Sequence, residues 1–77
     1  MRNKYDPQGE YQAYILYCVD EGYVSAIYDT NLNYTDFVYS AISFDSVSEA
    51  RAIAGYLTDK YGVATHVVSF KIDLTVV

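Results

Sequence analysis

The chain is poor in the residues that build covalent and metal-centred sites. Its 77 residues include one cysteine, Cys18, one histidine, His66, a single proline and no tryptophan. One cysteine excludes a disulfide within the chain, and one Cys and one His far apart in sequence do not make a zinc site. A domain this small buries little more than about 60% of its unfolded surface. We therefore expect stability to come from a tight hydrophobic core or from self-association.

Basic residues are also scarce, with five Lys and Arg against ten Asp and Glu, a net charge of −5. Because phosphate binding needs clustered cations, this balance argues against direct nucleic-acid binding. A protein partner with a basic surface is compatible with it through electrostatic steering. Modest negative charge also serves solubility alone.

Long apolar runs are absent. No stretch approaches the roughly 18 apolar residues of a membrane helix, and residues 1–7 lack the apolar segment of a secretory signal. A lone thiol suits a reducing compartment. We expect a cytoplasmic protein with no membrane contact and no cofactor.

Tyrosine, by contrast, is abundant, at ten residues. Tyrosine gives a large contact area with few rotatable bonds and a polar tip, which suits protein interfaces. It is also a good strand former, so its abundance alone does not separate an interface from a sheet.

Hydrophobic periodicity predicts a flexible lead-in at 1–10 and one domain at 11–77. Apolar alternation predicts strands at 11–19, 23–28, 37–43 and 65–76, with the Asn- and Asp-rich segment 29–36 as a loop. Both faces of 11–19 are apolar, which is typical of a covered strand. In 65–76 the face of His66, Val68 and Phe70 is expected to meet the core. We expect this strand to pair with the first, in the middle of the sheet.

One helix is indicated between Ser46 and Gly62. Ser46 and Glu49 form a capping-box pattern, and Gly62 is a natural terminator. Gly55 lies inside this helix, where glycine lowers helix stability by about 1 kcal/mol relative to alanine. It is a candidate for close approach of another backbone. The apolar stripe consists of Val47, Ala50, Ile53, Ala54, Leu57 and Tyr61.

The predicted fold class is therefore α+β: an antiparallel sheet of about four strands with one helix on one face, in the order β-β-β-α-β. Cys18 is expected to be a buried structural thiol, and His66 an ordinary histidine at the start of a strand. Neither has a partner at a spacing typical of catalysis, so no enzyme is expected.

The acidic residues of the turns are the first candidates for partner binding. We expect Asp20 and Glu21 at one end of the sheet, with Asp29 and Asp36 flanking the connection at the other end. Their spacing does not fit a calcium loop, and turn chemistry and helix capping also explain such residues.

Tyrosines on the sheet face away from the helix are the second candidates. Tyr14, Tyr23, Tyr34 and Tyr39 lie on or beside the predicted strands. A contiguous exposed aromatic patch would mark a protein interface. The alternative is that these rings fill a thin core.

A short acidic chain with a β-rich body, one helix from Ser46 to Gly62 and no catalytic motif resembles a known group of inhibitors. These are the small proteins that bacteriophages and mobile elements use to block host defence, anti-CRISPR proteins among them. The resemblance implies stoichiometric inhibition of a nucleic-acid-handling defence complex, such as a CRISPR effector, in the host cytoplasm. The alternative is a homo-oligomerising structural or regulatory module, because a free strand edge can pair with a copy of itself.

Overall fold

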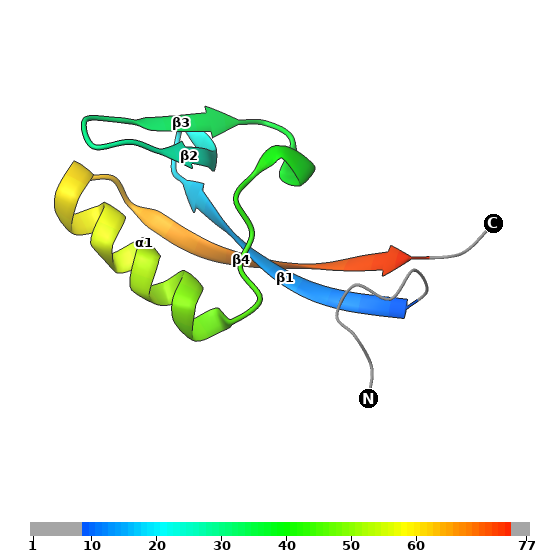
Figure 1. The fold of residues 1–77 in the computed structure, drawn as a ribbon. Helices are drawn as coiled ribbons and strands as arrows, with labels where there is room; N and C mark the ends of the chain where they lie inside the picture. Colours follow the sequence, from blue (N-terminus) through cyan, green and yellow to red (C-terminus); the bar gives the residue numbers. More distant parts are fainter. Residues whose placement is uncertain (1–8, 75–77) are drawn as a thin grey trace.

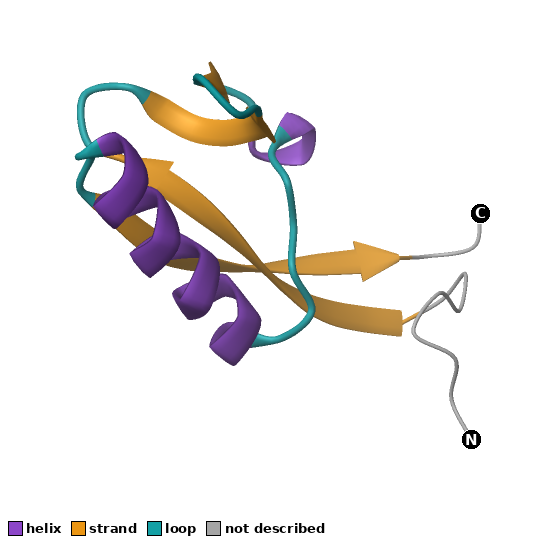
Figure 2. Ribbon diagram, turned by 60° about the vertical axis from the view of Figure 1, so that its left-hand side comes forward, coloured by secondary structure: helices purple, strands orange, loops and turns teal. Residues whose placement is uncertain are grey.

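The structure is a computed structural model that describes residues 9–74. Its elements are β1 (Gly9–Cys18), β2 (Gly22–Ile27), β3 (Leu32–Thr35), the 3₁₀ turn η1 (Val38–Ser40), α1 (Val47–Tyr61) and β4 (Thr65–Leu74). They form one antiparallel four-stranded sheet with the helix on one face, which confirms the predicted α+β class and the β-β-β-α-β order (Figure 1). The layering is clearest from the side, where α1 lies in front of the long strands (Figure 2).

The strand order in the sheet is β3-β2-β1-β4. β4 runs antiparallel to β1 along its whole length, from Gly9↔Leu74 to Cys18↔Thr65, which confirms the predicted pairing of the first and last strands. β4 nevertheless lies at the edge of the sheet, because β2 occupies the other side of β1. β1 begins at Gly9, inside the segment predicted as a lead-in; the rest of that segment and residues 75 and 76 of the last strand lie outside the described residues.

The third strand was predicted in the wrong place. It is Leu32–Thr35, within the segment expected to be a loop. A tight turn closes the β2–β3 hairpin early, with the Tyr28 amide donating to the Asn31 carbonyl at 2.9 Å. This lets Leu32, only 8% exposed, join the core.

The segment predicted as the third strand instead crosses from β3 back to the helix. It contains η1, and Ile42 within it and Phe44 just after it bond to two strands in turn. The Ile42 amide donates to the Val24 carbonyl at 3.0 Å, and Phe44 exchanges backbone hydrogen bonds with Tyr14 at 2.9 and 2.8 Å. The segment fills the space where β1 and β2 diverge, since these two strands pair only at Tyr17↔Tyr23 and Cys18↔Gly22.

The helix follows the prediction closely. Ser46 is the N-cap, and its Oγ accepts the Glu49 amide at 3.4 Å. Gly62 ends the helix in the left-handed conformation, at φ 69°, which a residue without a Cβ adopts at little cost. Ala50, Ala54 and Leu57 of the predicted stripe are buried.

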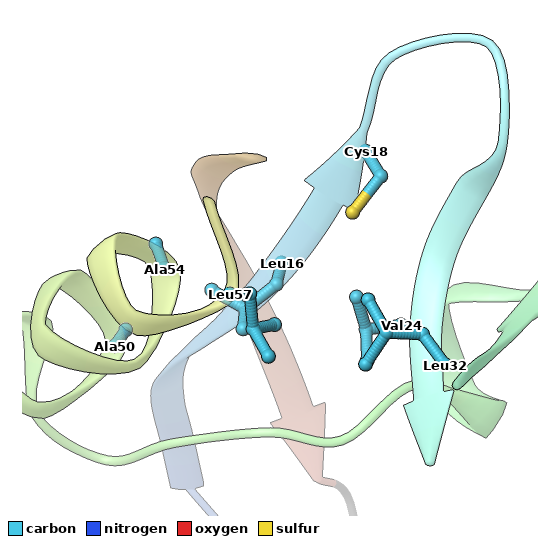
Figure 3. Packing of buried hydrophobic residues seen from close by; sticks show 7 residues of the cluster. All are labelled: Leu16, Cys18, Val24, Leu32, Ala50, Ala54 and Leu57. Atoms are coloured by element: carbon cyan, nitrogen blue, oxygen red, sulfur yellow. The ribbon is translucent and has the colours of Figure 1, made fainter. Parts of the chain in front are cut away.

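The core lies between α1 and the sheet. Leu57 of the helix points toward Leu16 and Val24, with Cys18 above them (Figure 3). β1 also buries Ile15 fully on its opposite face, as predicted for a strand covered on both sides. The predicted core face of β4 is wrong: Val67, not Val68, packs against the helix-side cluster, because the register pairs Val67 with Leu16.

Candidate functional site

Three of the predicted acidic residues meet at one end of the sheet. Asp20 and Glu21 form the β1–β2 turn, where Asp20 has a positive φ of 66°. Gly22 lies so close to the end of β3 that a Cβ built on it would be 3.1 Å from the Thr35 carbonyl oxygen and 3.7 Å from Asp36 Oδ1. Asp20, Glu21 and Asp36 are all exposed, and we call these three residues the acidic end.

The composition of the acidic end corrects the sequence prediction. Asp36 was expected beside Asp29, at the other end of the sheet. Because β3 occupies 32–35, Asp36 follows that strand and returns to the β1–β2 turn, whereas Asp29 remains at the far end in the β2–β3 turn. The structure therefore separates Asp29 from the other three acids.

Two exposed aromatic residues, Phe37 and Tyr39, lie within three positions after Asp36. Phe37 is 73% exposed and Tyr39 is 78% exposed. The Thr35 hydroxyl accepts the Phe37 amide at 3.1 Å, which fixes the chain as it leaves β3. The ring of Tyr39 meets Phe70 of β4 edge to face, with centroids 6.1 Å apart. Phe37 was not among the predicted site residues; the sequence placed it only at the start of the strand predicted at 37–43.

The four predicted tyrosines do not form one patch. Tyr14 and Tyr34 lie on the helix side, half-buried and packed against the core cluster. Tyr23 lies on the opposite face, edge to face with Tyr17 at 5.3 Å between ring centroids. Only Tyr39 of the four is strongly exposed. Tyr14 and Tyr34 thus fit the alternative that these rings fill a thin core.

Tyr34 connects the core to the acidic end. Burial raises the pKa of its hydroxyl, and the neighbouring Cys18 and Glu21 raise this pKa further. An anion at Tyr34 is therefore disfavoured in the folded protein.

Cys18 has the buried surroundings that the sequence predicted, whereas His66, expected on the core face of its strand, is exposed. Cys18 is fully buried, with its Sγ 3.5 Å from Thr65 Oγ1. His66 is an exposed residue of the edge strand β4. Within residues 9–74 there is no cluster of three or more His, Cys, Asp or Glu side chains that could hold a metal ion.

A groove of about 730 Å³ lies between α1 and β4, and no residue of β2 or β3 is among those that line it. The helix residues that line it include Arg51, Gly55 and Asp59, and the strand residues are Thr65, His66, Val67 and Ser69. Tyr14 lines its base from β1. The groove thus runs beside the free edge of the sheet and is separate from the acidic end.

The chain matches no protein-family model, no curated protein and no solved structure. In the part of the chain that the structure describes, the one helix, α1, is too short and too polar to cross a membrane.

Proposed function

We propose that this protein is a non-enzymatic binding module that inhibits a nucleic-acid-handling defence complex by stoichiometric association. The observation that carries the proposal is the acidic end, Asp20, Glu21 and Asp36, next to the exposed side chain of Phe37. An aromatic anchor bordered by charge of one sign is a common composition for a protein interface. The matching partner has a basic surface with an apolar recess.

The class of partner follows from charge and from the resemblance to phage-encoded inhibitors. Proteins that handle nucleic acids carry basic surfaces, and three carboxylates at one end of a chain of net charge −5 complement such a surface. Complementary charge mainly raises the association rate and makes binding sensitive to salt. A CRISPR effector in the host cytoplasm is the partner that the resemblance implies.

The test is capture of purified CRISPR effector complexes by the immobilised protein, followed by binding measurements at about 50 and 300 mM salt. We expect affinity to fall with salt, and the triple variant Asp20→Lys/Glu21→Lys/Asp36→Lys to lose binding. Phe37→Ala should lose at least tenfold in affinity, since aromatic anchors dominate interface energies.

Asp29→Lys is the matched control, because Asp29 is an exposed turn acid at the opposite end of the sheet. It should retain most of the wild-type affinity. Binding that ignores salt, or that Asp29→Lys weakens as much as substitution at the acidic end, would contradict the proposal.

A further inference from the structure

The outer edge of β4 presents backbone groups that have no strand partner within residues 9–74. Tyr14 exchanges both of its backbone hydrogen bonds with Phe44, on the side of β1 away from β4. Ser69 lies opposite Tyr14 in the β1–β4 register, so this is a non-hydrogen-bonded pair and the Ser69 amide and carbonyl face outward. The same alternation turns the backbone groups of Val67 outward. No strand among residues 9–74 pairs with this edge.

The flank of α1 beside this edge has a self-complementary charge pattern. Arg51, Gly55 and Asp59 follow one another at intervals of four residues and line the same groove, so they lie along one side of the helix. Arg51 and Asp59 are exposed, and neither has an ion-pair partner in the described part of the chain. Gly55 lies midway between the two charges.

Packing against the described part of the chain does not explain Gly55. A Cβ built on it would meet nothing within 4 Å, and the residue is exposed. The sequence predicted close approach of another backbone here, and no backbone of residues 9–74 makes it. Glycine inside a helix lowers stability, so its place between two unpaired charges suits contact with another molecule.

A twofold axis perpendicular to the sheet satisfies all three features together. It pairs β4 with β4 of a second copy in antiparallel fashion and places both helices on the same face, also antiparallel. With the axis near Gly55, Arg51 of each copy lies opposite Asp59 of the other. Because the contacts of α1 are with both β4 and β1, the helix axes would be about 10 Å apart across a strand spacing of about 4.8 Å.

We propose that the β4 edge and the Arg51–Gly55–Asp59 flank of α1 form a twofold interface with a second copy of this chain. The dimer has a continuous eight-stranded sheet with two antiparallel helices on one face, and two symmetry-related Arg51–Asp59 ion pairs close the groove. The interface is isologous, as expected of most homodimers. It does not involve the acidic end, so this proposal and the proposed function can fail independently.

The experiment is sedimentation velocity of the wild-type protein over a concentration series, with charge-reversed variants. Arg51→Asp and Asp59→Arg each place like charges opposite one another in the dimer, so each variant alone should be at least tenfold weaker in self-association. The double variant Arg51→Asp/Asp59→Arg carries the same pairs in reversed order and should dimerise like wild type.

A mixture of the two single variants gives a sharper test. In the proposed dimer the two acids of one chain face the two arginines of the other, so an equimolar mixture should form heterodimers although neither variant dimerises alone. Lys60→Asp is the matched control: it changes charge by as much as Arg51→Asp, but Lys60 lies over the rings of Tyr56 and Tyr61 and not in the groove. It should leave the dimer intact.

Far-ultraviolet circular dichroism of each variant checks the fold. Gly55→Gln adds a side chain where the chain itself leaves space, so it should keep the fold and weaken the dimer at least tenfold. A wild-type protein that stays monomeric at all concentrations up to several hundred micromolar would overturn the proposal. So would a dimer indifferent to Arg51→Asp, or a groove that binds an extended peptide of another protein in place of a second copy.

Discussion

The two edges of the sheet are built very differently. β3, on one edge, has four residues, and its partner β2 has a register shift between Val24 and Ala26. β4, on the other edge, pairs with β1 over ten residues without a register shift. Short and irregular edges resist pairing with other chains, whereas long regular edges promote it. The difference indicates that the sheet ends at β3 and that β4 is the edge at which another strand can be added.

The strongest test of this comparison is a pair of proline substitutions in β4. Tyr14↔Ser69 is a non-hydrogen-bonded pair, so Ile15↔Val68 is a hydrogen-bonded one. Val68→Pro removes the donor to the carbonyl of Ile15, a fully buried residue, and should destabilise the monomer by about 2–4 kcal/mol. Ser69→Pro removes only an outward donor and should keep the fold while abolishing self-association.

Urea denaturation at low concentration measures the monomer, because dimerisation would add a concentration-dependent contribution to stability. Equal destabilisation by the two prolines would mean that the Ser69 amide is engaged within the chain. That result would mean that the outer edge of β4 is not available to pair with a second copy.

The next largest effect is expected at the other edge. Leu32 of β3 is 8% exposed and belongs to the core cluster with Val24 and Leu57. Leu32→Ala should lower the free energy of unfolding by about 2–3 kcal/mol, through lost burial and a residual cavity. If the sheet simply ends at β3, the folded fraction of this variant should dimerise like wild type.

Asn33→Ala is the control for Leu32→Ala, since Asn33 is an exposed residue of the same strand. It should change stability by less than about 0.5 kcal/mol. Loss of self-association in Leu32→Ala at temperatures where the monomer is fully folded would show that the β3 edge contributes to the interface.

Structure that depends on neighbouring residues was predicted well from the sequence, whereas structure that depends on contacts between distant segments was predicted poorly. The helix was predicted from Ser46 to Gly62 because its cap, stripe and terminator are encoded within the segment itself. The third strand was misplaced because 37–43 has strand-like composition. Residues 32–35 form the strand instead, because a tight turn places them beside β2 and because Leu32 is buried there. Tertiary packing overrides propensity in such short segments.

The candidate sites show the same limit. The turn acids were found individually, but their grouping depended on the position of β3, so Asp36 was assigned to the wrong end. Of the Arg51–Gly55–Asp59 flank, the sequence indicated only Gly55, as a candidate for close approach of another backbone. Its significance required knowing that β4 is an edge strand and that the groove lies beside it.

The smallest predicted effect is a pH dependence of stability that comes from Tyr34 of β3. Burial, with Cys18 and Glu21 nearby, raises the pKa of Tyr34 above its ordinary value of 10.0. A raised folded-state pKa contributes stability that is present below the unfolded pKa and is lost as pH rises through the folded pKa. Wild-type stability should therefore decline more steeply above pH 10 than that of Tyr34→Phe, whose ring cannot ionise.

Urea denaturation between pH 8 and about pH 11 measures this difference, with Tyr39→Phe, at a 78% exposed position, expected to follow wild type. Parallel declines for wild type and Tyr34→Phe would show that Tyr34 is as free to ionise in the folded chain as in the unfolded one, and that the β3 side is more open to water than its packing against the core indicates.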